Sequence, residues 1–245
     1  MSTLERLSVE HLAAKDSFQQ ESVRLHLERY AFAAQYVNAK RVLDLACGVG
    51  YGSALLSDSG AAQVVGIDIE PAAIEQARAT YARPNIEFIA RGYESLRASA
   101  ASDLAVIAQP FDAVVSLETI EHLPDPDDFV EVIAARLVSG GMMVASVPVT
   151  PSMDANPYHL QDFTSRSFRR LLKRHGLQEV ASKQQRQEFD PFRVRKQLAD
   201  AGRSEFRQNL MGYYATHPYA VYKRAYSTLR HGFVNLVDIV AARKA

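Results

Sequence analysis

One short stretch early in the chain combines residue types that suit close contact with a ligand. Residues 42–53 have the sequence VLDLACGVGYGS, with the acid Asp44 inside an apolar run and glycines at Gly48, Gly50 and Gly52. Glycines let a backbone turn at positive φ and approach a bound group closely. A strand that leads into such a loop and then into a helix is the usual frame for a nucleotide-like ligand.

Three kinds of glycine loop could contain this stretch. A dinucleotide-binding loop needs a third glycine where this chain has Ser53, and a phosphate-binding P-loop needs a Gly-Lys pair that is absent. The third kind is the first motif of class I S-adenosylmethionine-dependent methyltransferases, which VLDLACGVG resembles residue by residue. VVGIDIEPAAIEQA resembles the second motif of that family, FDAVVSLETIEHLPDP the motif at its fourth strand and LVSGGMMVASVP its fifth strand. The resemblance covers about residues 24–182 and depends on these motifs as a set.

The resemblance implies a Rossmann-like α/β fold, in which a mostly parallel seven-stranded sheet carries helices on both faces. It also implies S-adenosyl-L-methionine as cofactor, with S-adenosyl-L-homocysteine as its product. The residues that the resemblance assigns to cofactor binding are Arg29, Asp44, Ala46, Gly48, Gly50, Asp68, Ile69, Tyr93, Glu94, Leu117 and Glu118.

These residues have different implied roles. Gly48 and Gly50 would pass under the methionine part, and Asp68 would accept hydrogen bonds from the two ribose hydroxyls. Ile69 would lie beside the adenine, Leu117 and Glu118 would line the amino-acid end, and Arg29 would bind the cofactor carboxylate. Family members often have an acid after the third strand, where this chain has Gly92, so Tyr93 or Glu94 is expected to contact the adenine instead.

Two histidines are candidates for moving a proton. His122, in ETIEHL, follows the fourth expected strand and His159, in NPYHLQDFT, follows the fifth, so both belong to the carboxyl edge of the sheet. A hydroxyl acceptor needs a base, which is most often His. We expect His159 to be this base and His122 to orient the acceptor. The alternatives are a cofactor-pocket or helix-capping role for His122 and a loop-ordering role for His159.

No metal site is expected. The only cysteine is Cys47, and the acidic run DPDD at 125–128 is typical of a loop and a helix N-terminus. The remaining histidines are expected to be structural or exposed: His11, His26, His175, His217 and His231.

The pattern NP-H---FT---F--LL after the fifth strand resembles bacterial methyltransferases of glycan and natural-product pathways. It implies O-methylation of a sugar, a glycan or a small secondary metabolite. Alternatives are C- or N-methylation of a quinone-like or polyketide metabolite, or a non-catalytic cofactor-binding scaffold. NPYH also resembles the N-P-P-Y motif of enzymes that methylate nucleic acids, but that motif follows the fourth strand. Zero net charge further disfavours a nucleic acid partner.

Strands and helices must alternate to position these residues. Apolar runs predict strands at 41–46, 63–68, 86–90, 111–117 and 141–147, with helices at 51–59, 71–81, 94–108 and 127–138. Residues 139–141, SGG, are expected to end the last helix and open the next strand. Further on, the pattern predicts a helix at 165–175, capped by Thr164 or Ser165 and closed by Gly176, and strands at 177–184 and 233–244. This alternation predicts a parallel sheet with right-handed crossovers.

We expect a single methyltransferase domain over residues 1–245. Its parts are an N-terminal helical lid at 1–38, a cofactor-binding core at 39–183, an insertion at 184–231 and a last strand at 232–245. The insertion has a helix-like stretch at 192–202 and is expected to be a lid or a dimer surface. Its side chains suit sugar or phosphate contact, or plain helix packing: Arg193, Arg195, Lys196, Tyr213, Tyr214, Tyr219 and Tyr222.

The composition is that of an ordinary globular protein, with 47% hydrophobic and 23% charged residues. No apolar run of 18 residues and no signal-peptide core is evident, so we expect a cytoplasmic protein without a membrane span. Residues 1–165 carry 22 acidic and 11 basic side chains, whereas residues 166–245 carry 6 and 17. Either the basic segment meets an anionic small-molecule or saccharide acceptor, or the two parts attract each other.

Overall fold

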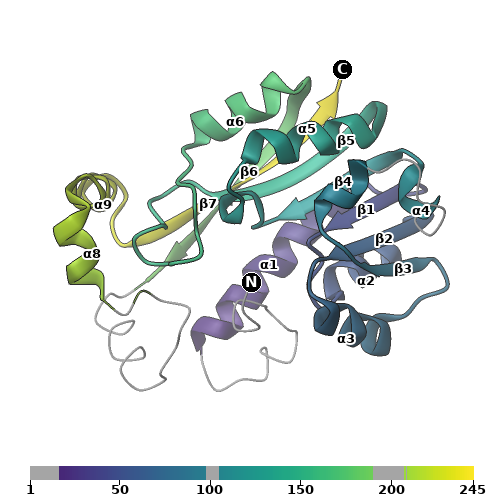
Figure 1. Cartoon of the computed structure of the whole chain (residues 1–245), viewed down its shortest axis with the longest axis horizontal. Coiled ribbons are helices and arrows are strands. Elements are labelled where there is room, and N and C mark those ends of the chain that lie inside the picture. Colours follow the sequence, from purple (N-terminus) through teal and green to yellow (C-terminus); the bar gives the residue numbers. More distant parts are fainter. Residues whose placement is uncertain (1–16, 98–104, 190–206, 208) are drawn as a thin grey trace.

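The computed structural model describes residues 17–97, 105–189, 207 and 209–245 (Figure 1). The strands are β1 (Arg41–Leu45), β2 (Gln63–Asp68), β3 (Ile86–Ala90), β4 (Phe111–Leu117), β5 (Leu137–Pro148), β6 (Leu177–Glu188) and β7 (Val234–Lys244). The helices are α1 (Ser17–Ala34), α2 (Tyr51–Asp58), α3 (Pro71–Tyr81), α4 (Ala105–Ala108), α5 (Pro126–Arg136), α6 (Ser165–Arg174), α8 (Leu210–Thr216) and α9 (Pro218–His231). Two short 3₁₀ turns are η3 (Tyr93–Arg97) and η5 (Ile120–His122).

The seven strands form one sheet in the order β3-β2-β1-β4-β5-β7-β6. The first five strands are parallel, and β7 pairs antiparallel with both β5 and β6. The predicted mostly parallel seven-stranded sheet is therefore confirmed. Because β1, β2 and β4 are adjacent and parallel, their carboxyl ends meet at one edge of the sheet.

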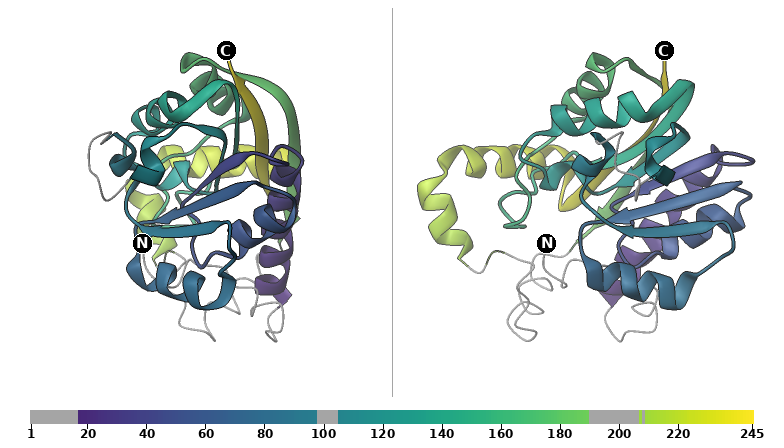
Figure 2. Two further views of the ribbon diagram at one scale, coloured as in Figure 1. Left: turned by 90° about the vertical axis from the view of Figure 1, so that its right-hand side faces the viewer. Right: turned by 45° about the vertical axis from the view of Figure 1, so that its right-hand side comes forward.

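Helices cover both faces of the sheet (Figure 2). Val42, Val64 and Val115 pack with Tyr30 of α1 and Leu56 of α2 in one buried core. The residues next to them in the strands point the other way, as the alternation of side chains in a strand requires. Leu43, Val65 and Val114 join a second core with Phe129 of α5 and Phe168 of α6. Burial on both faces explains why these strands are continuous apolar runs.

Most of the predicted elements are confirmed close to their predicted bounds. Strands β2, β3 and β4 and helix α3 have the predicted residues, and β1 ends at Leu45 because Ala46 adopts a positive φ of 65°. Thr164 caps α6 and shares reciprocal hydrogen bonds with Ser167. Gly176 follows the end of that helix with a φ of 76°, as expected.

Two predictions about elements were wrong. The helix expected at 94–108 is replaced, in its described part, by η3 and the short α4. The stretch at 139–141 lies inside β5, which starts at Leu137 directly after α5. The register of β5 against β4 jumps from Phe111–Leu137 to Ala113–Met142, so residues 138–141 form a bulge in which Gly140 has a φ of 74°.

The insertion adds two helices beyond the sheet. Helices α8 and α9 lie away from the sheet at the far end of β6 and β7 (Figure 1). The N-terminal helical segment is confirmed as α1, whereas residues 1–16 and the helix-like stretch at 192–202, with Arg193, Arg195 and Lys196, lie outside the described residues. Within the described part of the chain, no helix is both long and apolar enough to span a membrane.

Charged contacts anchor the insertion to the loop that follows β5. Asp154 of that loop is buried and accepts hydrogen bonds from Arg224 at 2.5 and 2.8 Å and from the Tyr214 hydroxyl at 2.6 Å. Lys223 pairs with Asp162 of the same loop. The basic end of the chain thus attracts acids of the first part, which accounts for at least some of the uneven charge along the sequence.

Removing the Arg224 guanidinium should loosen this anchor. Burial alone would raise the pKa of Asp154, but hydrogen bonds and charge from Arg224 outweigh burial and lower it. Breaking a buried pair costs about 3–5 kcal/mol, and because Arg224 keeps 23% of its side chain exposed we expect about 2–3 kcal/mol for Arg224→Ala. This stabilisation should be present above the ordinary Asp pKa and should be lost as the pH falls through the lowered value.

The measurement is urea denaturation of Arg224→Ala at neutral and acidic pH. Arg230→Ala on the same helix is the matched control, because Arg230 contacts the exposed Tyr226 and should change stability by less than about 0.5 kcal/mol. Equal stability of the two variants at neutral pH would contradict the assigned anchor.

Candidate active site

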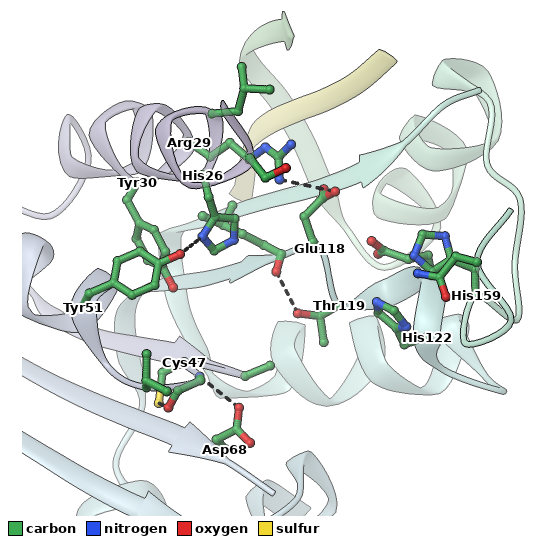
Figure 3. A pocket seen from close by; sticks show the side chains of 18 of the residues that line it. His26, Arg29, Tyr30, Cys47, Tyr51, Asp68, Glu118, Thr119, His122 and His159 are labelled. Atoms are coloured by element: carbon green, nitrogen blue, oxygen red, sulfur yellow. Dashed lines mark hydrogen bonds and ion pairs between the residues drawn. The ribbon is translucent and has the colours of Figure 1, made fainter. Parts of the chain in front are cut away.

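A cavity of about 320 Å³ lies where the carboxyl ends of β1, β2 and β4 meet (Figure 3). Helix α1 forms one wall, and the loops after β1 and β4 form others. The loop after β5 closes the remaining side with Asn156 and His159. This is the edge at which open α/β sheets bind their ligands.

The glycine loop after β1 forms the floor of the cavity together with Asp68. The Gly48 N–H donates to Asp68 Oδ2 at 2.9 Å, and the Glu70 N–H donates to Oδ1 at 3.0 Å. Asp68 therefore holds the loop in place and also faces the cavity. Ala46 and Gly48, which the resemblance assigns to cofactor binding, also line the cavity.

Gly48 and Gly50 serve different purposes. A Cβ atom at Gly48 would have no heavy atom within 4 Å, so the space beside Gly48 can accept a ligand. A Cβ atom at Gly50 would lie 2.6 Å from Ala77 Cβ and 2.8 Å from the Phe88 ring. Gly50 is outside the cavity lining, and its missing side chain lets α2 pack against α3 and β3.

Asp44 also stabilises the fold, and its side chain lies outside the cavity lining. Its carboxylate is buried and accepts hydrogen bonds from the Ser53 hydroxyl at 2.6 Å and the Tyr30 hydroxyl at 3.1 Å. Burial raises the pKa of Asp44 to about 6, although both hydrogen bonds oppose this rise. The acid at the end of β1 thus joins α1 and α2 to the strand.

Arg29 and Glu118, which the resemblance assigns to the amino-acid end of the cofactor, form an ion pair in the cavity lining. Arg29 Nη1 lies 3.3 Å from Glu118 Oε2, and its Nε donates to Gln185 at 2.7 Å. The Ser146 hydroxyl donates to Glu118 Oε1 at 2.8 Å. Leu117 lies beside this pair in the cavity wall. A cation and an anion held together match the opposite charges of an amino acid's carboxylate and ammonium groups.

The residues expected to contact the adenine lie outside the cavity lining. Ile69 is 63% exposed, and the Tyr93 hydroxyl donates to Asp128 at 2.9 Å while its ring packs on Phe129. Glu94 has its carboxylate against Gly92. None of these three side chains lines the cavity as the structure stands.

His26 was expected to be structural or exposed, but it lines the cavity. Its Nδ1 is hydrogen bonded to the Tyr51 hydroxyl, and burial lowers the pKa of His26 to about 3. The spacing along the helix could have predicted this position of His26. Arg29 and Tyr30 follow His26 by three and four residues, so the three side chains share one face of α1. That face is the one turned toward the glycine loop (Figure 3).

The two predicted catalytic histidines are brought together at one end of the cavity (Figure 3). The ring centroids of His122 and His159 are 4.6 Å apart, and the rings are nearly perpendicular. His122 Nδ1 lies 3.2 Å from the Tyr158 carbonyl oxygen, and His159 Nδ1 lies 2.8 Å from the Ser152 hydroxyl. Burial, and then the neighbouring His122, lower the pKa of His159 to about 3, so its ring is neutral.

Backbone hydrogen bonds fix the loop that carries His159. The N–H groups of Leu160 and Gln161 both donate to the Glu121 carbonyl oxygen, at 2.8 and 3.1 Å. Glu121 and His122 belong to η5, directly after β4. The close approach of His122 and His159 therefore follows from the pairing of two loops at the edge of the sheet.

Comparisons with known proteins agree with this geometry. Residues 43–145 match the methyltransferase domain family. A probable S-adenosylmethionine-dependent methyltransferase of Mycolicibacterium smegmatis is 30% identical over 161 residues, which cover 63% of this chain and 58% of that protein. A ubiquinone biosynthesis O-methyltransferase of Neisseria meningitidis is 38% identical over 112 residues, which cover 45% of this chain and 44% of that protein.

A solved structure extends the likeness over almost the whole chain. The N-methyltransferase NodS of Bradyrhizobium japonicum, in complex with S-adenosyl-L-homocysteine, matches with a TM-score of 0.56 at 17% identity, covering 98% of this chain and 94% of that one. At this identity the match shows the fold alone. The chain spans less than two thirds of the length of the two curated relatives. The sheet order, the glycine loop and these matches support a class I S-adenosylmethionine-dependent methyltransferase, and the family match covers residues 43–145, less than half of the chain.

Proposed function

We propose that this chain transfers the methyl group of S-adenosylmethionine to a hydroxyl oxygen of a small molecule, namely a saccharide or a small secondary metabolite. The observation that supports this most directly is the single cavity that joins Gly48, Asp68 and the Arg29–Glu118 pair to His122 and His159. One end of the cavity suits the cofactor, and the other end offers imidazoles to an acceptor.

The cofactor half of the proposal uses charge and hydrogen bonding. Asp68 would accept hydrogen bonds from the ribose hydroxyls, while Arg29 and Glu118 would bind the carboxylate and ammonium of the methionine part. Charge-assisted hydrogen bonds of this kind are the strong ones. Gly48 leaves room for the ligand to pass over the backbone.

The acceptor half requires alignment and removal of a proton. The acceptor oxygen attacks the methyl carbon, the carbon–sulfur bond breaks, and its electron pair stays on sulfur to give S-adenosylhomocysteine. The hydroxyl proton passes to His159 Nε2, while His122 orients the acceptor. Because His122 Nδ1 faces a carbonyl oxygen, Nδ1 must carry the ring hydrogen, and Nε2 is left as an acceptor.

The name of the Neisseria relative, an O-methyltransferase, supports oxygen as the methylated atom. A base matters most for a hydroxyl acceptor, and the cavity holds imidazoles where such a base is needed. The insertion would act as a cover at the acceptor end, because Lys223 and Arg224 hold the loop that carries His159. The exposed Tyr219, Tyr222 and Tyr226 of α9 stack along one another and suit the alternative, a homodimer surface.

Replacing His159 tests the acceptor half. General-base help is worth about 10²–10⁴-fold, so His159→Ala should lower methyl transfer by about that factor. Affinity for S-adenosylhomocysteine should stay within about twofold, because Asp68 and the glycine loop are intact. Transfer would be measured with methyl-labelled cofactor against a panel of phenolic and saccharide alcohols. His217→Ala is the control, since His217 is exposed near the start of α9. Full turnover in His159→Ala would contradict the role of this histidine.

The two glycines test the cofactor half. Both have positive φ, which costs an alanine about 1–2 kcal/mol. Gly50→Ala also overpacks Ala77 and Phe88, so it should lose about 2–5 kcal/mol of stability in denaturant unfolding. Gly48→Ala should lose about 1–2 kcal/mol of stability but weaken S-adenosylhomocysteine binding at least tenfold by calorimetry, because its methyl group enters the cavity. Unchanged affinity in a folded Gly48→Ala would contradict the assigned cofactor position.

A further inference from the structure

We propose that Glu121, His122 and His159 form a binding site for one divalent ion of a first-row transition metal. One ligand atom from each side chain lies within 4.8 Å of the other two. Glu121 is fully buried, and both histidines are partly buried. Two imidazoles and one carboxylate form a ligand set that zinc and its neighbours, such as cobalt, accept with positions left open. Among the described residues, no other group of His, Cys, Asp and Glu side chains meets this condition.

The hydrogen bonds around the two histidines orient them as ligands. A metal-bound histidine commonly donates its other ring N–H to a carbonyl oxygen or a similar acceptor. His122 Nδ1 donates to the Tyr158 carbonyl oxygen, and His159 Nδ1 is held by the Ser152 hydroxyl. Both rings are thereby left with Nε2 as the atom that can bind an ion. Asp162 Oδ1 holds Ser152 in turn, because it accepts from the Ser152 backbone N–H at 2.9 Å and from the Ser152 hydroxyl at 3.5 Å.

The backbone holds the three side chains close to one another. Glu121 and His122 are consecutive, and the segment after His159 is hydrogen bonded to the Glu121 carbonyl oxygen. An ion with bonds of about 2.0–2.2 Å keeps its ligand atoms within about 4.4 Å of one another. The upper bound of 4.8 Å between the ligand atoms in this structure exceeds that value by about 0.4 Å.

The site differs from the acidic run at 125–128, which has other partners. Asp125 caps α5, Asp127 pairs with Arg174, and Asp128 pairs with Arg97. The proposed ion lies at the histidines and not at this acidic run. This group could not be predicted from the sequence, because His159 is far from Glu121 along the chain.

An ion in this position would have a consequence for catalysis, which rests on the proposed function. Glu121, His122 and His159 all line the cavity, so the open coordination positions face the acceptor. A hydroxyl bound to the ion has a lowered pKa and can lose its proton to water. In the loaded protein the ion would thus replace His159 as the group that activates the acceptor oxygen.

Titration with Co²⁺ alone tests the site on its own, with protein that lacks a polyhistidine tag. We expect one equivalent of Co²⁺ to bind, with visible absorption bands of an imidazole-ligated, low-coordinate ion. Removing a side chain that is hydrogen bonded to a metal ligand lowers metal affinity by about 10–100-fold. Ser152 is hydrogen bonded to His159, so Ser152→Ala should weaken Co²⁺ binding by about tenfold. Glu121→Gln, His122→Ala and His159→Ala should each weaken it by about 100-fold or more. His217→Ala should bind like the unaltered protein.

S-adenosylhomocysteine binding by each variant shows that it is folded. The absence of saturable Co²⁺ binding, or binding that survives Glu121→Gln and His159→Ala in folded variants, would overturn the proposal. The titration needs no acceptor and no methyl transfer. Failure to find methyl transfer would therefore count against the proposed function and leave the Co²⁺ result standing.

Discussion

The cavity depends on the hydrogen bonds of the buried Asp44 carboxylate. It accepts hydrogen bonds from Tyr30 of α1 and Ser53 of α2, and so fixes both helices to the end of β1. The Tyr30 ring then lies where a Cβ atom at Gly52 would stand, so α1 can approach α2 only because Gly52 has no side chain. This close approach places His26 and Arg29 of α1 above the glycine loop.

A second constraint acts at the opposite end of the cavity, where charge from the insertion holds the loop after β5. Asp154 and Asp162 of this loop receive Arg224 and Lys223 from α9. The same loop is hydrogen bonded to Glu121 after β4 and carries His159. The position of His159 therefore depends on residues that are far from it along the chain.

The sequence predicted the features that arise from local pattern. Strands β2, β3 and β4 and helix α3 were predicted from apolar periodicity. Thr164 or Ser165 was predicted as the cap of α6 from its side-chain chemistry, and Thr164 is the cap. The glycine loop and Asp68 were identified because their motifs resemble the first two motifs of the methyltransferase family. Ala46, Gly48, Asp68, Leu117, Glu118 and Arg29 accordingly line one cavity.

Features set by contacts between distant segments could not be predicted in this way. The bulge at 138–141 is a property of the register between β4 and β5, and residues 139–141 on their own suggested a helix end. Asp44 was assigned to cofactor binding, whereas its carboxylate accepts hydrogen bonds from Tyr30 and Ser53 and joins two helices to β1. Ile69 and Tyr93 follow strand ends, yet the tertiary packing of Tyr93 on Phe129 directs it away from the cavity. The grouping of Glu121 with His122 and His159 likewise depends on how two loops meet.

The central claim is that one cavity holds the cofactor with its sulfur directed at the paired histidines. A crystal structure of the chain with S-adenosylhomocysteine measures this most directly. We predict ribose hydroxyls within hydrogen-bonding distance of Asp68, the amino-acid end between Arg29 and Glu118, and the sulfur facing His122 and His159. A bound cofactor product whose sulfur faces away from both histidines, or which lies outside this cavity, would contradict the claim.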